Sequence, residues 1–168
     1  MLIFAYGSNM NIKRLRERVP SATKVANVFL LGYKIVCNKV SKKDSSAKAN
    51  IEKSENATDI VWGVLFEIDS KEKPLLDKAE GLGKGYNEDS LTFTDENNIE
   101  HIAKVYIADS SSINNSLVAY DWYKDFIITG AIQNELPADY ISQLQLIPFI
   151  QDPDKERREK NYAILHGE

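Results

Sequence analysis

The chain has 168 residues, of which 43% are hydrophobic, and a formal net charge of -4 from 21 basic and 25 acidic side chains. This length and apolar content suit one domain spanning residues 1–168, and the mixed charges, without a basic stripe, argue against a nucleic-acid partner. The sequence has neither a basic leader nor eighteen consecutive apolar residues, which argues against export and against a membrane span.

Cysteine and histidine are too rare to suggest a disulfide or a metal site. Cys37 stands alone, and His101 and His166 lie far apart in the sequence. The sequence therefore predicts no metal, no cofactor and a reducing, cytoplasmic location.

In the first half of the chain, the sequence predicts a strand, a helix and then further strands. Apolar runs and alternation indicate strands, whereas apolar residues at three- and four-residue intervals indicate helices. Gly7 ends the first strand, and Asn9 or Asn11 can cap the helix. In order, we expect a strand at 2–6, a helix at 11–19, one long or two short strands at 25–37, a polar loop at 38–48, and a hairpin of strands 49–52 and 60–68.

The second half alternates short helices with one more hairpin. Pro74 suits the first position of a helix, and Gly81 and Gly130 suit helix ends. The order of elements favours an α+β domain built on a curled, mostly antiparallel sheet. In order, we expect a helix at 75–80, a hairpin of strands 90–94 and 101–108, helices at 117–129 and 137–146, and a solvated helix or polar tail over 153–168.

The segment Tyr6-Gly7-Ser8-Asn9 is the first candidate for binding. A strand that runs into a glycine turn and then into a helix leaves several backbone N–H groups without partners in the chain. Such groups can bind a carboxylate or a carbonyl oxygen that gains charge. The plain structural alternative is that Gly7 makes a turn while Ser8 or Asn9 caps the helix.

Glu80 is the candidate general acid/base. It stands in the last turn of its helix, where the helix dipole disfavours a negative charge, and Asp77 adds like charge three residues earlier. Both effects would favour uptake of a proton, as a general acid/base requires. The alternative is a solvated surface acid whose charge Lys78 or Lys84 compensates. Tyr86 follows in a turn and could present its hydroxyl to a ligand or bury its ring.

Other conspicuous residues have structural interpretations. Cys37 ends an apolar segment without a neighbouring base, which favours a buried small hydrophobe over a nucleophile. Tyr123 shares helical spacing with apolar neighbours and is interpreted as core, while Arg14 and Arg18 fall on the polar face of the first helix. His101 is interpreted as a surface residue of an outer strand.

Taken in order, these motifs resemble the γ-glutamyl cyclotransferase family, which includes AIG2-like proteins, over most of residues 2–147. The resemblance implies a closed, mostly antiparallel β-barrel with helices around it, in which Tyr6 to Asn9 cradle the substrate, Glu80 is the acid/base and Tyr86 lines the site. The fragments that carry it are Phe4-Ala5-Tyr6-Gly7-Ser8-Asn9-Met10, Val61-Trp62-Gly63-Val64, Leu76-Asp77-x-x-Glu80-Gly81 and Tyr86, and more weakly Gly130-Ala131 and Leu136-Pro137.

The resemblance also implies a cofactor-free reaction, in which a small γ-glutamyl amide cyclises to 5-oxoproline and releases an amine or amino acid. It places such an enzyme in glutathione metabolism, as a cytoplasmic monomer or homodimer. One alternative is release of γ-glutamyl groups from modified amines or acylated metabolites, with a leaving-group pocket formed by loops 38–48 and 109–116. Another is a non-catalytic binding module on the same fold, although a binder of carboxylates would gain nothing from Glu80.

Overall fold

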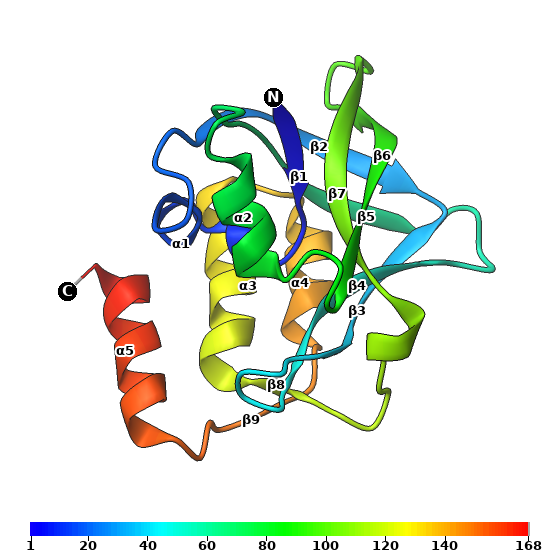
Figure 1. Ribbon diagram of the computed structural model, residues 1–168. Helices are drawn as coiled ribbons and strands as arrows, with labels where there is room; N and C mark the ends of the chain where they lie inside the picture. The colour runs from blue at the N-terminus through cyan, green and yellow to red at the C-terminus, as the bar shows by residue number, and fades with distance from the viewer. Residues whose placement is uncertain (168) are drawn as a thin grey trace.

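The computed structural model describes residues 1–167, and Figure 1 shows strands on one side of the molecule with helices packed beside them. None of the helices in these residues is long and apolar enough to cross a membrane. The strands are β1 (Leu2–Ala5), β2 (Thr23–Leu31), β3 (Tyr33–Val40), β4 (Ala47–Lys53), β5 (Ile60–Glu67), β6 (Tyr86–Asp95), β7 (Glu100–Ala108), β8 (Ala119–Tyr120) and β9 (Phe149–Ile150). The helices are α1 (Ile12–Arg16), α2 (Lys73–Glu80), α3 (Asp121–Gln133), α4 (Ala138–Gln145) and α5 (Lys155–His166), with 3₁₀ turns η1 (Ser8–Met10) and η2 (Ser110–Ser112).

The central feature is a closed barrel in which the strands follow the order β1, β5, β2, β6 and β7. Neighbouring strands are antiparallel except β1 and β7, which meet in parallel where Ile3 lies opposite Lys104. Phe4 and Phe93 are buried in the core, with their rings stacked at a centroid distance of 4.1 Å. The predicted α+β fold with a curled, mostly antiparallel barrel is confirmed.

The predicted hairpin between residues 49–52 and 60–68 is wrong. β4 pairs with β3 in a separate two-stranded sheet, whereas β5 lies between β1 and β2 in the barrel. Most residues of β5 from Val61 to Phe66 are buried, which is typical of a strand with partners on both edges. Turn-forming residues between two strands therefore do not decide which strands pair.

The predicted polar loop over residues 38–48 is shorter than expected, because β3 and β4 leave only residues 41–46 between them. Asn50 Nδ2 donates to Asn38 Oδ1 at 3.3 Å, and Asn38 Nδ2 donates to Glu52 Oε1 at 2.7 Å. Polar side chains are accommodated in buried strands when other groups satisfy their hydrogen bonds. The polar residues at both ends of the predicted loop therefore belong to β3 and β4.

Helix boundaries follow local capping signals where these are strong. Asn11 Oδ1 accepts a hydrogen bond from Arg14 N at 3.2 Å and begins α1, and Gly81 ends α2 with a φ of 74°. The helix predicted over 117–129 begins later, at Asp121, because the residues before it form β8 and pair with β9.

Gly130 does not end α3, contrary to the prediction, since this helix continues to Gln133. A Cβ atom at position 130 would lie 2.6 Å from the backbone nitrogen of Asn11 and 2.8 Å from the carbonyl carbon of Met10. The missing side chain allows α3 to approach the segment after β1 closely. Gly130 thereby lets α3 pack against Met10 and Asn11, which directly follow the Tyr6–Asn9 loop.

We expect Gly130→Ala to destabilise the protein, although alanine is normally favoured over glycine in a helix by about 1 kcal/mol. The new methyl group would meet the backbone of Met10 and Asn11, and such overpacking typically costs about 1–3 kcal/mol. Thermal unfolding would show this as a lower midpoint. Ile132→Ala, at an exposed position of the same helix, is the control and should change the midpoint little. A higher midpoint for Gly130→Ala would contradict the close contact.

Helix α5 covers most of the described part of the segment predicted as a solvated helix or polar tail, and Glu168 lies outside the described residues. It packs against α1 and α3. Arg157 pairs with the buried Asp152 at 2.6 Å, and Arg158 pairs with Asp121 at 2.6 Å. These ion pairs, together with a few apolar contacts, attach the charged helix to the rest of the protein.

Candidate active site

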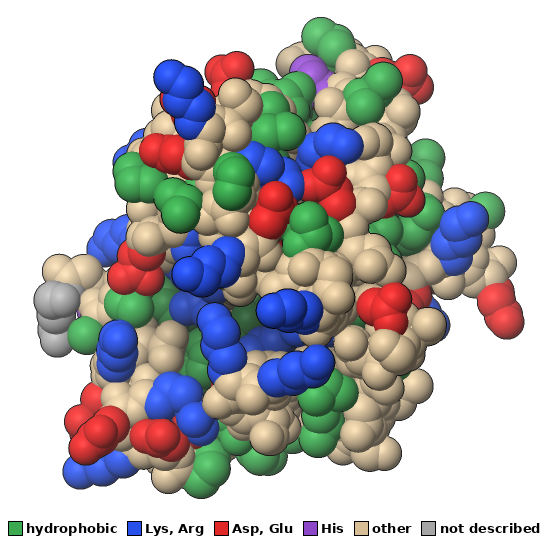
Figure 2. All heavy atoms as spheres, in the orientation of Figure 1, with side chains coloured by type: hydrophobic (Ala, Val, Ile, Leu, Met, Phe, Trp, Pro, Cys, Tyr) green, Lys and Arg blue, Asp and Glu red, His purple; other side chains and the backbone are tan. Residues whose placement is uncertain are grey.

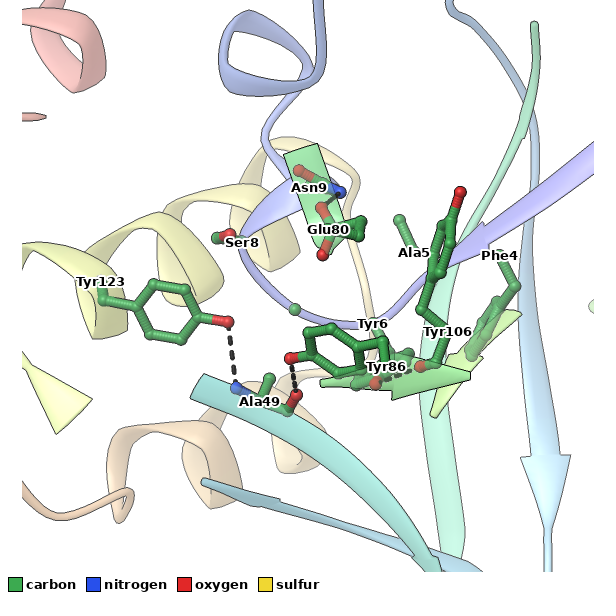
Figure 3. Close-up of a pocket in the computed structure, with 11 residues that line it drawn as sticks. Phe4, Ala5, Tyr6, Ser8, Asn9, Ala49, Glu80, Tyr86, Tyr106 and Tyr123 are labelled. Carbon is green, nitrogen blue, oxygen red and sulfur yellow. Dashed lines mark hydrogen bonds between the residues drawn. The ribbon is translucent and has the colours of Figure 1, made fainter. Parts of the chain in front are cut away.

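The candidate site lies where β1 ends and the Tyr6–Asn9 loop begins (Figure 3). The loop passes close to β4, because a Cβ atom on Gly7 would lie only 3.0 Å from the Cβ of Ala49. The backbone N–H groups of Gly7, Ser8 and Asn9 donate no hydrogen bond to any group in residues 1–167. They are therefore available to an anionic group of a ligand.

Glu80 ends α2, and its carboxylate faces this loop (Figure 3). Its Oε1 accepts hydrogen bonds from Asn9 Nδ2 at 2.9 Å and from Arg18 Nη1, which also donates to Asn9 Oδ1 at 2.7 Å. These contacts fix the orientation of the carboxylate. Within the described residues, Glu80 Oε2 accepts no hydrogen bond. One carboxylate oxygen is thus held in place, and the other is available to a substrate.

Asp77 is not the neighbour that matters for Glu80, contrary to the prediction. The carboxylate of Asp77 pairs with Lys73 and accepts a hydrogen bond from the Tyr106 hydroxyl at 2.7 Å. The group next to Glu80 is the guanidinium of Arg18, with which it forms an ion pair. This ion pair holds the Glu80 carboxylate against the loop.

Buried tyrosines form the wall of the site. Tyr6 donates its hydroxyl hydrogen to the carbonyl of Tyr106 at 2.6 Å, and Tyr86 donates to the carbonyl of Ala49 at 2.5 Å. Tyr123 instead accepts a hydrogen bond from Ala49 N at 3.0 Å and donates to no described residue. Burial raises the pKa of Tyr6, Tyr86 and Tyr123, so these hydroxyls stay protonated. Tyr123 therefore has one hydrogen to offer a ligand.

A small inner pocket opens into a wider mouth. The inner pocket has a volume of about 40 Å³ and the mouth about 600 Å³, and both are lined by Glu80, Tyr86 and Tyr123. Among the described residues, ten lysines and arginines line the mouth, but only three acidic residues, Glu17, Asp44 and Glu80, do so. Figure 2 shows basic side chains gathered around this hollow. Charges that are mixed along the sequence are therefore separated in space.

Arg14 holds the loop from the side of α3 and α5. Its Nε donates to Ser8 Oγ at 3.1 Å, its Nη1 donates to Asn161 Oδ1 at 3.2 Å, and its guanidinium lies 4.5 Å from the ring centroid of Phe126. Burial lowers the pKa of Arg14 to about 10, so the side chain remains charged at neutral pH. Through Asn161, helix α5 contributes to the surroundings of the site.

Neither Cys37 nor the histidines belong to this site. Burial raises the pKa of the Cys37 thiol to about 12, as suits an unreactive cysteine. His101 contacts Asp95 at 2.9 Å in the hairpin of β6 and β7. In residues 1–167, no three histidine, cysteine or acidic side chains are grouped in a way that could hold a metal ion.

Sequence reasoning brought together the Tyr6–Asn9 loop, Glu80 and Tyr86, but it missed Arg18 and Tyr123. The sequence could have indicated a role for Tyr123, because a hydroxyl within an apolar stripe often has a buried polar partner. No sequence pattern indicated a role for Arg18, since its partners lie 9 and 62 residues away in the sequence.

The chain is similar to known proteins in sequence and in structure. The AIG2-like family matches residues 60–144, from β5 to α4. The γ-glutamylcyclotransferase of Bos taurus is 30% identical over 170 residues, and that of Homo sapiens is 29% identical over 172 residues. Each alignment covers 99% of this chain and 89% of the relative. The chain belongs to the AIG2-like family. A solved structure of a γ-glutamyl cyclotransferase is also similar, with a TM-score of 0.87 at 27% identity and 99% coverage of both chains.

Membership of the AIG2-like family confirms the resemblance found in the sequence. Glu80 lies inside the matched residues 60–144, whereas the Tyr6–Asn9 loop precedes them. In this AIG2-like protein the two segments meet only through the fold, because β1 lies beside β5 and directs the loop towards the end of α2.

Proposed function

We propose that this chain is a γ-glutamyl cyclotransferase, which converts a small γ-glutamyl amide into 5-oxoproline and a free amine or amino acid. One observation carries the proposal: within residues 1–167, Glu80 Oε2 accepts no hydrogen bond, and Glu80 lines the same inner pocket as residues 7–9 with their available N–H groups. The names of the mammalian relatives and of the similar structure support it.

The substrate contains its own nucleophile, so the protein need not supply one. The neutral α-amine nitrogen attacks the γ-carbonyl carbon, and the new C–N bond closes a five-membered ring. Glu80 takes a proton from that nitrogen and delivers one to the departing nitrogen as the amide bond breaks. A pocket that holds the substrate curled favours ring closure, because well-oriented intramolecular reactions reach effective molarities of about 10⁵–10⁸ M.

The loop and Tyr123 are the proposed hydrogen-bond donors to the substrate. The N–H groups of residues 7–9 and the Tyr123 hydroxyl would bind the glutamyl carboxylate and the carbonyl oxygen that gains charge. One well-placed donor to such an oxygen contributes about 2.7–4 kcal/mol. Tyr6 and Tyr86 would shape the wall instead, because their hydroxyls are engaged by backbone carbonyls.

The proposal includes several further expectations. The protein would act as a single domain in the cytoplasm, in glutathione metabolism or other turnover of γ-glutamyl compounds. It would need no cofactor, would bind neither nucleic acid nor membrane, and would be a monomer or homodimer. These expectations follow from the sequence composition and from the family resemblance.

The proposal is tested by incubating the purified protein with γ-glutamyl amino acids and γ-glutamyl amines and measuring 5-oxoproline by mass spectrometry. We expect product from the wild type, with or without a chelator, and far less from Glu80→Gln. Binding of a γ-glutamyl compound without formation of 5-oxoproline would contradict the proposal and indicate a non-catalytic binding module.

A further inference from the structure

The mouth of the pocket has a charge opposite to that of the whole chain. The protein carries a net charge of -4, yet ten basic residues line the mouth against three acidic ones (Figure 2). Two of these acids are already paired, Glu80 with Arg18 and Asp44 with Lys48 at 2.7 Å. Arg157 is paired as well, with Asp152 outside the mouth. Among the described residues, seven cations of the mouth take part in no ion pair, against Glu17 as the one acid there without a pair.

Lys39 is the most distinctive of these cations. The residue is only 9% exposed, and in residues 1–167 its ammonium takes part in no ion pair or hydrogen bond. It lies 4.6 Å from the ring centroid of Tyr86, which lines the inner pocket. Its end fits there because Gly85 has no side chain: a Cβ atom at position 85 would lie 2.9 Å from Lys39 Nζ.

The Lys39 side chain is mostly buried while its Nζ still reaches solvent, and a partly desolvated ammonium without an ion-pair partner is stabilised by an opposite charge. Burial lowers the pKa of Lys39, and the nearby Lys42 and Lys43 lower it further, while Glu80 and Asp44 oppose them. Arg14 likewise has neutral partners, Ser8 and Asn161. An anion bound at the junction of the pocket and the mouth would supply that charge.

We propose that the leaving group of the substrate is an acidic amino acid or acidic peptide that carries more than one carboxylate. This inference rests on the proposed cyclotransferase function. Lys39 binds the carboxylate next to the scissile amide, because it lies beside the inner pocket that holds Glu80. Lys42 and Lys43, exposed at the rim, attract the second carboxylate. γ-Glutamylamines, whose leaving groups have no carboxylate, are the poorest substrates.

Three substrates whose leaving groups carry two, one and no carboxylates test the inference: γ-glutamyl-glutamate, γ-glutamyl-glutamine and γ-glutamyl-butylamide. We expect kcat/KM to fall by about ten- to a hundredfold from the glutamine to the butylamide substrate, as for a buried hydrogen bond to a charged group. From the glutamate to the glutamine substrate we expect a decrease of up to about fivefold, as for exposed ion pairs. The difference in kcat/KM between the glutamate and glutamine substrates should decrease as salt is added.

Substitutions of lysines test which residues cause each difference in kcat/KM. Lys39→Gln should remove most of the difference between the glutamine and butylamide substrates, and Lys42→Gln with Lys43→Gln should remove the difference between glutamate and glutamine. Lys34→Gln is the matched control, because Lys34 is exposed on the same strand and lines a separate groove. If Lys39→Gln does not fold, the double variant Lys42→Gln/Lys43→Gln and the salt series still test whether the mouth selects acidic leaving groups.

The outcomes separate the two proposals. Equal kcat/KM for all three substrates, or a preference for the butylamide, would overturn the acidic leaving group while leaving cyclotransfer intact. Absence of 5-oxoproline from every substrate, in wild-type protein that is folded, would instead overturn the proposed function itself.

Discussion

Glutamine in place of Glu80 is expected to lower kcat by about 10²–10⁴-fold, which is the usual contribution of general acid/base catalysis. KM should change much less, because glutamine keeps the size of the side chain. Its Oε1 can still accept hydrogen bonds from Asn9 and Arg18, so the fold and the pocket should be retained. What glutamine cannot do is take the proton of the attacking amine. Steady-state kinetics would measure the effect, and thermal unfolding would show that the fold is intact.

Glu67→Gln is the matched control for this experiment. Glu67 ends β5, is exposed and lies outside the pocket, so its replacement makes the same change of charge without touching the site. We expect kcat to be unchanged. If Glu80→Gln were equally active, Glu80 would be only a structural partner of Arg18, and another group would have to carry the proton.

Phenylalanine in place of Tyr123 is expected to lower kcat/KM by about 10²–10³-fold, as for the loss of one donor to an oxyanion. The Tyr123 hydroxyl is unusual among the wall tyrosines because it accepts a hydrogen bond from Ala49 N and donates to no group in residues 1–167. Its removal also leaves the Ala49 N–H without its acceptor, at a cost of about 1–3 kcal/mol in the free energy of unfolding. Kinetics and thermal unfolding should both be recorded.

The two effects of Tyr123→Phe can be separated. Tyr140→Phe makes the same chemical change at a buried position of α4 that lines a separate groove, and its activity should equal that of the wild type. A Tyr123→Phe protein that is less stable but has unchanged kcat/KM would show that the hydroxyl only supports β4. A loss of activity much larger than the loss of folded protein would support its role as a donor.

Much of the fold could be predicted because the signals are local. The turn at Gly7, the cap at Asn11 and the end of α2 at Gly81 each depend on residues within one turn of the chain, and the structure confirms these features. The predictions that failed depend on partners elsewhere. Whether β4 pairs with β3 or with β5, and whether Gly130 ends a helix or allows a close contact, depends on what lies against those segments.

The sequence alone determined the order of the longer strands and helices, without β8 and β9, and the types of group that carry the chemistry, namely a glycine loop and a glutamate at a helix end. Only the tertiary structure showed that Arg18 holds Glu80, that the Tyr123 hydroxyl accepts from Ala49 N and that basic side chains gather around the mouth. The physical reason is that propensities and caps act between near neighbours in the chain. Hydrogen bonds and charge act across space, and barrel closure brings together residues that are far apart in sequence.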